Sequence, residues 1–101
     1  ISAGKRLSLQ LHDMKQESYF LFNGRCNLVV ENTQGKLETI EIKPGKGYSV
    51  NVGQKHRLQA ITDCDVFEVS TPEIGITYRL EDDYSRPDET SELRERERKY
   101  K

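Results

Sequence analysis

The interpretation of this chain starts from six consecutive residues, Leu7-Ser8-Leu9-Gln10-Leu11-His12. Leucines alternate here with polar residues, and a period of two is typical of a β-strand whose two faces differ in polarity. The sequence therefore predicts a strand with Gln10 and His12 on one face and the three leucines on the other. We expect the polar pair to face the interior and the leucines to form an apolar outer face.

Similar short runs fill the rest of the first 80 residues. Apolar or β-branched runs occupy residues 19–22, 26–30, 37–42, 48–52, 57–61, 66–69 and 74–80. They are separated by turn-forming stretches rich in Gly, Asn and Pro at residues 23–24, 32–35, 44–47 and 53–54. Gly and Asn tolerate positive φ, and Pro fixes φ at a value that suits a turn. Seven or eight short strands separated by turns predict an all-β sandwich or barrel.

The charge distribution divides the chain in two. Residues 81–101 hold 14 of the 33 charged residues, so the core must lie before residue 81. We expect one compact domain over residues 1–86 and a charged tail over residues 87–101. The tail has helix-forming residues with opposite charges three or four positions apart, which predicts a short solvated helix. Truncation after Asp88 should then change stability by less than about 1 kcal/mol.

Composition excludes several classes of protein. The chain has 101 residues and a net charge of −1, which gives no electrostatic reason to expect binding to nucleic acid or to an anionic membrane. No apolar run approaches the roughly 18–20 residues that a membrane helix needs. The two cysteines, Cys26 and Cys64, are too few for a disulfide framework, so we expect reduced thiols and a cytoplasmic location.

Four residues form a candidate metal site: Gln10, His12, Glu17 and His56. Gln10 and His12 share a strand face, an antiparallel return can bring Glu17 opposite that face, and His56 begins another expected strand. Two imidazoles, a carboxylate and an amide oxygen suit one divalent ion such as Zn, Mn, Fe, Co or Ni. His12, Glu17 and His56 alone also match the facial triad of non-haem iron oxygenases. The alternative is that each histidine is an ordinary polar residue of a strand.

The spacing of these residues resembles the two motifs of the cupin superfamily. The first motif is Gly, five residues, His, one, His, three or four, Glu, six, Gly. The second is Gly, five residues, Pro, one, Gly, two, His, three, Asn. The matching positions here are Gly4, Gln10, His12, Glu17 and Gly24, then Gly45, Asn51, Gly53, His56 and Ala60. Gln10 replaces a ligand histidine, and its side-chain oxygen can still bind a metal. The resemblance implies an antiparallel jelly-roll barrel that holds a metal ion.

A narrower resemblance is to the cupin domain of type II mannose-6-phosphate isomerases. Residues 8–17 are similar to the segment S-L-Q-x-H-x-H-R-x-E of that domain, and residues 53–58 to its G-T-x-H-R-L. Residues 79–86 are similar to its R-F-E-D-x-Y-G-R. Met14 and Ser18 stand where the family has histidines. The resemblance implies a Gln, His, Glu, His metal set and a sugar phosphate as ligand.

Three functions follow as hypotheses. The first is a metal-dependent isomerase-like protein acting on a sugar or sugar phosphate, with Glu17, Tyr19, Arg79 and Arg86 as candidate catalytic or ligand-contacting residues. The second is a small-molecule-binding module without catalysis, and the third is a metal-dependent dioxygenase. Six basic residues could bind a phosphate by charge-assisted hydrogen bonds, namely Lys5, Arg6, Lys15, Arg57, Arg79 and Arg86. Cupins often pair through an apolar outer face, so we also expect a homodimer.

Overall fold

The computed structural model describes residues 1–72, 75–83 and 86–93. The strands are β1 (Leu9–His12), β2 (Glu17–Asn23), β3 (Cys26–Glu31), β4 (Leu37–Ile42), β5 (Gly47–Val50), β6 (His56–Ala60), β7 (Asp65–Ser70) and β8 (Thr77–Glu81). Within the described ranges, helix is limited to residues 91–93. No helix there is long and apolar enough to span a bilayer. The rest of the expected tail helix lies outside the described residues.

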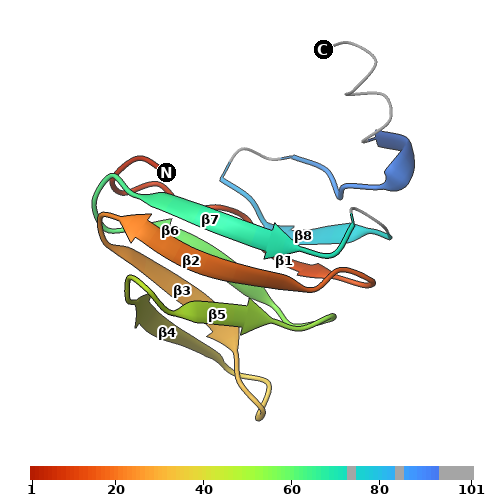
Figure 1. Ribbon diagram of the computed structural model, residues 1–101. Helices are drawn as coiled ribbons and strands as arrows, with labels where there is room; N and C mark the ends of the chain where they lie inside the picture. The colour runs from red at the N-terminus through yellow and green to blue at the C-terminus, as the bar shows by residue number, and fades with distance from the viewer. Residues whose placement is uncertain (73–74, 84–85, 94–101) are drawn as a thin grey trace.

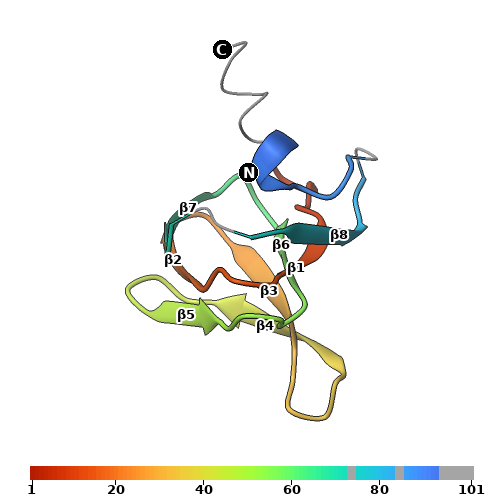
Figure 2. The ribbon, with the colours of Figure 1, turned by 90° about the vertical axis from the view of Figure 1, so that its right-hand side faces the viewer.

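The strands form two antiparallel sheets. One has five strands in the order β4-β3-β6-β1-β8, and the other has three in the order β5-β2-β7 (Figure 1). Viewed from the side, β2 and β7 lie opposite β6, β1 and β8 (Figure 2). The all-β prediction and each of the expected strands are confirmed, with Ile74 of the last run outside the described residues.

The core lies between the two sheets. Alternate residues of β3, namely Cys26, Leu28 and Val30, are buried, and the residues between them are half-buried. On β2 the buried positions are Glu17, Tyr19 and Leu21, so a carboxylate occupies an inward position that an apolar side chain would normally fill. The complete buried cluster is Tyr19, Leu21, Cys26, Leu28, Val30, Ile42, Val50, Leu58, Ala60 and Cys64.

The expected outer face of three leucines does not form. Arg6 pairs with Gln59, and Gln10 pairs with His56. The three residues 7–9 between the first partners therefore lie opposite only two residues, 57–58, of β6. An extra residue of this kind is a β-bulge, and it reverses the alternation of side chains along the strand. Leu7 consequently lines a cavity that Tyr19 and Leu58 also line. Leu9 is buried and Leu11 is half-buried, whereas Leu7 keeps an exposed fraction of 39%.

The first residues of the expected tail pair with the barrel. Backbone hydrogen bonds join Thr77 N to Glu89 O at 2.8 Å and Glu89 N to Thr77 O at 2.9 Å. Asp88 Oδ1 accepts a hydrogen bond from Arg79 N at 2.9 Å. We call residues 86–93 the strap, because they lie along the outer edge of β8 (Figure 2). The expectation that everything after Asp88 is dispensable is therefore revised.

Candidate metal centre

Three buried side chains converge between the sheets. His12 ends β1, Glu17 begins β2 and His56 begins β6, and their potential ligand atoms all lie within 4.8 Å of one another. Their exposed fractions are 3%, 1% and 1%. The sheet pairing explains this convergence, because β1 and β6 are neighbours in one sheet and β2 faces them from the other. The turn before β6 is also fixed to β1, since Gly53 N donates to His12 O at 2.7 Å.

Both imidazoles contact the same carboxylate oxygen of Glu17. Nε2 of His12 lies 2.5 Å from Glu17 Oε1, and Nε2 of His56 lies 3.0 Å from the same atom. His56 Nδ1 lies 2.9 Å from the carbonyl oxygen of Gln54, which can only accept a hydrogen bond. Neutral His56 must then keep its proton on Nδ1, so its Nε2 lone pair faces the carboxylate. Two acceptors at this distance need a proton or a cation between them.

Thr77 orients the other imidazole from β8. Its Oγ1 lies 2.8 Å from His12 Nδ1, and the side chains of both residues are buried. A hydroxyl can donate or accept, so this contact fixes the ring plane of His12 without fixing its tautomer. The sequence analysis did not single out Thr77, because a threonine inside an expected strand carries no signal for a site.

Glu17 is held as a carboxylate. Burial raises the pKa of its carboxyl group, but the interactions of Oε1 with the imidazoles of His12 and His56 outweigh that effect, and the pKa falls below its ordinary value. Its second oxygen, Oε2, is buried and makes no hydrogen bond within the described part of the chain. The Lys15 ammonium lies 3.7 Å from Oε2 as an ion pair. A buried carboxylate with an oxygen that accepts no hydrogen bond is a favourable site for positive charge.

A polar cavity of about 180 Å³ opens onto this cluster. Its lining residues include Gln10, His12, Lys15, Glu17, Glu68, Thr77, Arg79, Arg86 and Glu89. Gln10 is the expected fourth ligand, and it lines this cavity beside His12. Its Oε1 accepts a hydrogen bond from Ser8 Oγ at 2.9 Å. Lys15 was one of several basic residues with no distinguishing feature in the sequence, and its place two residues before Glu17 is the one signal that could have selected it.

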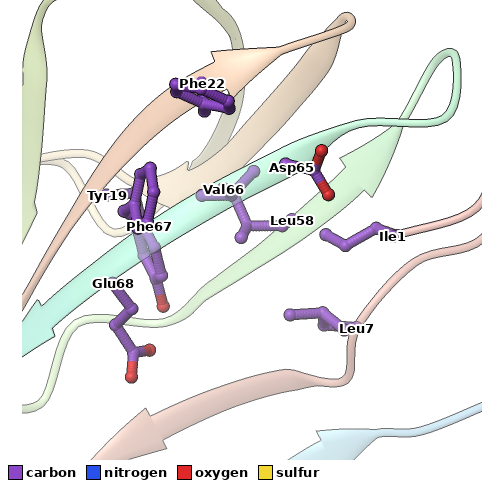
Figure 3. Close-up of a pocket in the computed structure, with 9 residues that line it drawn as sticks. All are labelled: Ile1, Leu7, Tyr19, Phe22, Leu58, Asp65, Val66, Phe67 and Glu68. Atoms are coloured by element: carbon purple, nitrogen blue, oxygen red, sulfur yellow. The ribbon is translucent and has the colours of Figure 1, made fainter.

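A larger, mostly apolar cavity of about 630 Å³ lies next to the polar one and shares Leu7 and Glu68 with it. Tyr19 lines this second cavity together with Leu58 and Val66, which come from facing strands (Figure 3). The ring of Tyr19 also lies 6.2 Å from that of His56, measured between centroids. Burial, followed by the charge of Glu17, raises the pKa of the Tyr19 phenol far above its ordinary value. Tyr19 is therefore a neutral phenol that contacts the cluster from the core.

Comparison with known proteins identifies the fold of the chain. No protein-family profile and no curated protein matches the chain. Among solved structures, oxalate decarboxylase from Bacillus subtilis matches with a TM-score of 0.66 and 18% identity, over 79% of this chain and 22% of that one. A sugar phosphate isomerase-like protein from Acidithiobacillus ferrooxidans matches with a TM-score of 0.62 and 18% identity, over 76% and 49%. The chain has the cupin fold.

A third structural neighbour extends the cupin match. The capsular polysaccharide assembling protein CapF from Staphylococcus aureus aligns with a TM-score of 0.57 and 13% identity, over 88% of this chain and 24% of that one. The chain thus spans about half or less of the length of the proteins it matches. At these identities the likeness concerns the fold, and it confirms the jelly-roll architecture expected from the two motifs.

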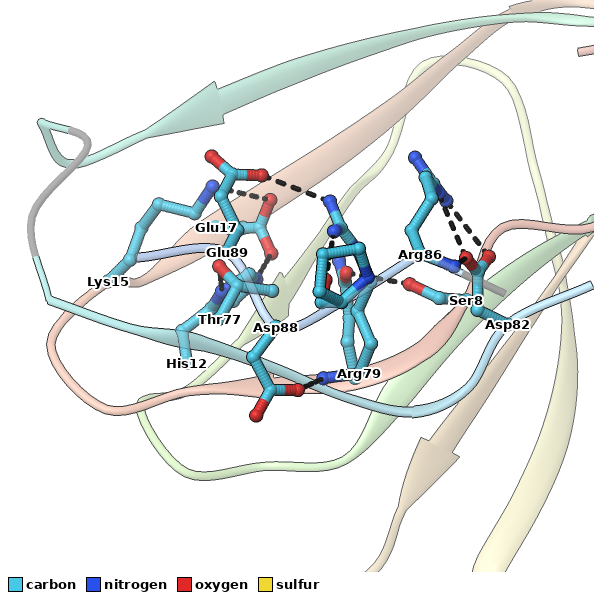
Figure 4. Close-up of polar contacts among 12 residues, drawn as sticks. Ser8, His12, Lys15, Glu17, Thr77, Arg79, Asp82, Arg86, Asp88 and Glu89 are labelled. Carbon is cyan, nitrogen blue, oxygen red and sulfur yellow. Dashed lines mark hydrogen bonds and ion pairs between the residues drawn. The ribbon is translucent and has the colours of Figure 1, made fainter. Parts of the chain in front are cut away.

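Both candidate arginines reach the polar cavity of the cupin barrel, and both are paired within the chain (Figure 4). Arg79 Nη2 lies 3.1 Å from Glu89 Oε2 of the strap. Arg86 forms a fork with Asp82, with Nε at 3.0 Å from Oδ2 and Nη2 at 3.1 Å from Oδ1. Glu89 is a cavity residue that the sequence analysis missed, because it lies in a run of charges that looks uniformly solvated.

The donor set of the cupin site fits a divalent cation. Two imidazole nitrogens face one carboxylate oxygen, the tautomer of His56 leaves a lone pair there, and the other oxygen of Glu17 has no hydrogen bond. Nitrogen and oxygen donors of this kind suit Zn, Mn, Fe, Co or Ni better than Cu(I). His12, Glu17 and His56 would hold the ion, and Gln10, which lines the same cavity, stays the expected fourth ligand.

Proposed function

We propose that this chain is a metal-binding cupin that binds or converts a sugar or sugar phosphate. The observation that carries the proposal is the convergence of two imidazoles on one buried carboxylate oxygen, beside a cavity that Lys15, Arg79 and Arg86 also line. Likeness of fold to a sugar phosphate isomerase-like protein supports the choice of ligand class. The small cavity favours a compact ligand.

The side chains around the polar cavity have different roles in the proposed function. A bound divalent ion supplies Lewis acidity toward the carbonyl and hydroxyl oxygens of a ligand. Thr77 and the Gln54 carbonyl hold the two imidazoles in place. Lys15 keeps positive charge beside Glu17. Arginine pairs with phosphate through two parallel hydrogen bonds, so Arg79 and Arg86 are suited to an anionic end of the ligand.

One observation favours binding without catalysis. The sequence has two histidines, and both face Glu17 in this cluster. No imidazole is left to move a proton between adjacent carbons, and Tyr19 has a phenol whose pKa is raised, which disfavours its action as a base. Glu17, Tyr19, Arg79 and Arg86 therefore remain candidates for contact with the ligand, and a small-molecule-binding module is the second function that we consider.

The metal is tested first. The purified chain should contain close to one equivalent of a divalent metal by elemental analysis, either as isolated or after loading. His56→Ala removes one of three ligand side chains, so its metal affinity should fall at least about tenfold. The matched control is Gln59→Ala, on the opposite face of the same strand, which should keep the metal. Retention of full affinity by His56→Ala would contradict the site.

The ligand is tested on metal-loaded protein. Titration with mannose 6-phosphate, fructose 6-phosphate and unphosphorylated mannose, followed by NMR shifts, should show saturable binding that is tightest for the phosphorylated sugars. Turnover of either phosphate would then favour the isomerase, and binding without turnover would favour the binding module. No binding of any sugar, together with iron-dependent oxygen consumption on another substrate, would favour the dioxygenase.

We also propose that the protein is located in the cytoplasm. Cys26 and Cys64 are both buried free thiols. Burial and the neighbouring Cys64 raise the pKa of the Cys26 thiol to about 12. A thiol with so high a pKa is unreactive at neutral pH, which is compatible with the reducing cytoplasm that the cysteine count suggested.

A further inference from the structure

Three consecutive strap residues converge on the side chain or backbone of one arginine. Arg79 donates from Nη1 to the carbonyl oxygen of Pro87 at 2.5 Å and from its backbone N to Asp88 Oδ1 at 2.9 Å. Its Nη2 pairs with Glu89 Oε2 at 3.1 Å. Figure 4 shows the contacts of Arg79 with Asp88 and Glu89, beside the side chains of His12, Glu17 and Thr77. Arg79 is thus the anchor that holds the strap to the barrel.

The same strap residue is coupled to the metal cluster. Glu89 exchanges two backbone hydrogen bonds with Thr77, and Thr77 Oγ1 contacts His12 Nδ1. The side chains of Arg79 and Glu89 both line the polar cavity that His12 and Glu17 line. The Glu89 carboxylate therefore lies inside the volume that a ligand would enter.

The guanidinium of Arg79 still has an unused donor. Its side chain is about nine-tenths buried, and Nε is buried without a hydrogen-bond partner in the described residues. A buried donor that gives up water without gaining an acceptor costs free energy, so a ligand oxygen that reached Nε would be favoured. Glu89 thus accepts a hydrogen bond from Nη2 of this guanidinium, whereas Nε has no acceptor in the described residues.

We propose that Glu89 occupies the anion-binding position of Arg79, and that an anionic group of the ligand displaces it. This inference rests on the proposed function and adds a specificity-determining residue to it. A ligand with a phosphate or carboxylate can replace the Glu89 carboxylate on the guanidinium, whereas a neutral ligand cannot. Loss of this ion pair weakens the attachment of the strap, which then depends on the backbone pairing of Glu89 with Thr77 and on the contacts of Pro87 and Asp88 with Arg79.

Competition of this kind lowers the apparent affinity for anions. The observed affinity for an anion depends on the fraction of molecules in which Arg79 is not paired with Glu89. A change that weakens the Arg79–Glu89 ion pair therefore raises the observed affinity. Glu89→Gln keeps the backbone pairing with Thr77 and removes the charge. We expect it to bind inorganic phosphate and mannose 6-phosphate roughly three- to tenfold more tightly than the wild type, with mannose unchanged.

The experiment compares five proteins after metal loading: wild type, Glu89→Gln, Arg79→Gln, the double variant with both changes, and Glu38→Gln. The last removes the same charge from an exposed site on β4, so it reports the effect of net charge alone. The gain should appear in Glu89→Gln and be absent from Glu38→Gln. It should also be absent when Arg79→Gln is combined with Glu89→Gln. An equal gain in the control, a gain that survives loss of Arg79, or no phosphate binding in any protein would overturn the proposal.

A second readout follows the strap directly. Phosphate should speed hydrogen exchange of the Glu89 amide, which donates to Thr77 O, in the wild type. Unchanged exchange at saturating phosphate would overturn the displacement. Metal content is measured on the same samples: a wild type that binds no metal contradicts the proposed function, and the phosphate titration then tests Glu89 on the metal-free protein.

Discussion

Gly24 shows how a single residue position constrains the barrel. It follows β2 with a φ of 81°, and a Cβ atom there would lie 2.2 Å from Asp63 O and 2.7 Å from Cys64 Cβ. Gly45 has a similar φ of 77° and nothing within 4 Å of the equivalent position. Both glycines relieve backbone strain, but Gly24 also lets two loops approach closely.

This pair gives a matched test of close packing. Gly45→Ala should lower the free energy of unfolding by about 1–2 kcal/mol, since it adds only the strain of a left-handed residue. Gly24→Ala should lower it by about 2–5 kcal/mol, because a steric clash adds to the same strain. Urea unfolding of both variants measures the difference. Equal losses would show that the loops near Asp63 and Cys64 can move apart freely.

Only part of the candidate site could be predicted from the sequence. His12, Glu17 and His56 could be selected because their residue types and spacing fit a known ligand pattern, and the structure brings them together. Thr77 and Glu89 could not, because they reach the cavity through strand pairing between segments 65 or more residues from His12, and no local pattern encodes that pairing.

The strap is the element whose role differs most from expectation. A chain ending at Asp88 loses two backbone hydrogen bonds between Thr77 and Glu89 and the ion pair of Arg79. We expect its free energy of unfolding to fall by about 1–3 kcal/mol, because each net hydrogen bond contributes about 1 kcal/mol.

The control for this truncation is a chain ending at Leu93, which keeps every described contact of the strap. Its stability should stay within about 0.5 kcal/mol of the wild type. Thermal unfolding of the two truncated chains, compared side by side, measures the effect. If the chain ending at Asp88 melts with the control, residues 89–93 of the strap contribute nothing to the stability of the barrel.

The positions of the strands along the chain were predictable from the sequence, and burial along a strand can be read where the alternation of side chains is regular. β3 alternates cleanly, and its inward residues were readable from the sequence. The segment before β1 was not, because one extra residue between Arg6 and Gln10 reverses the faces. A bulge depends on the partner strand, so the sequence of the bulged segment alone predicted an outward Leu7 that the structure places at a cavity.

At the scale of the whole molecule, the smaller sheet has an exposed apolar outer face. Phe20, Phe22, Phe67 and Val69 are exposed there, and the rings of Phe22 and Phe67 are in edge contact with centroids 5.5 Å apart. β7, which carries two of these residues, is also an edge strand of its sheet. An apolar face and an unpaired strand edge both favour association.

The sequence analysis expects a homodimer through the leucines of residues 7–11, but their common outer face does not form. We propose that a homodimer uses the outer face of the smaller sheet instead, since one contact with a second copy would cover both features. Phe22→Ser combined with Phe67→Ser should shift the chain from dimer to monomer in sedimentation equilibrium. Leu37→Ser makes the same kind of change on the other sheet and should leave the dimer intact. A wild type that sediments as a monomer at every concentration would contradict this assignment.

The cluster of His12, Glu17 and His56 lies between the two sheets, where aliphatic side chains would normally pack. Buried charged groups are poor contributors to stability compared with well-packed apolar side chains of the same volume. These three positions therefore stabilise the fold less than apolar side chains would. They form a locally frustrated part of the core, and a bound cation would convert it into a cross-link between the two sheets.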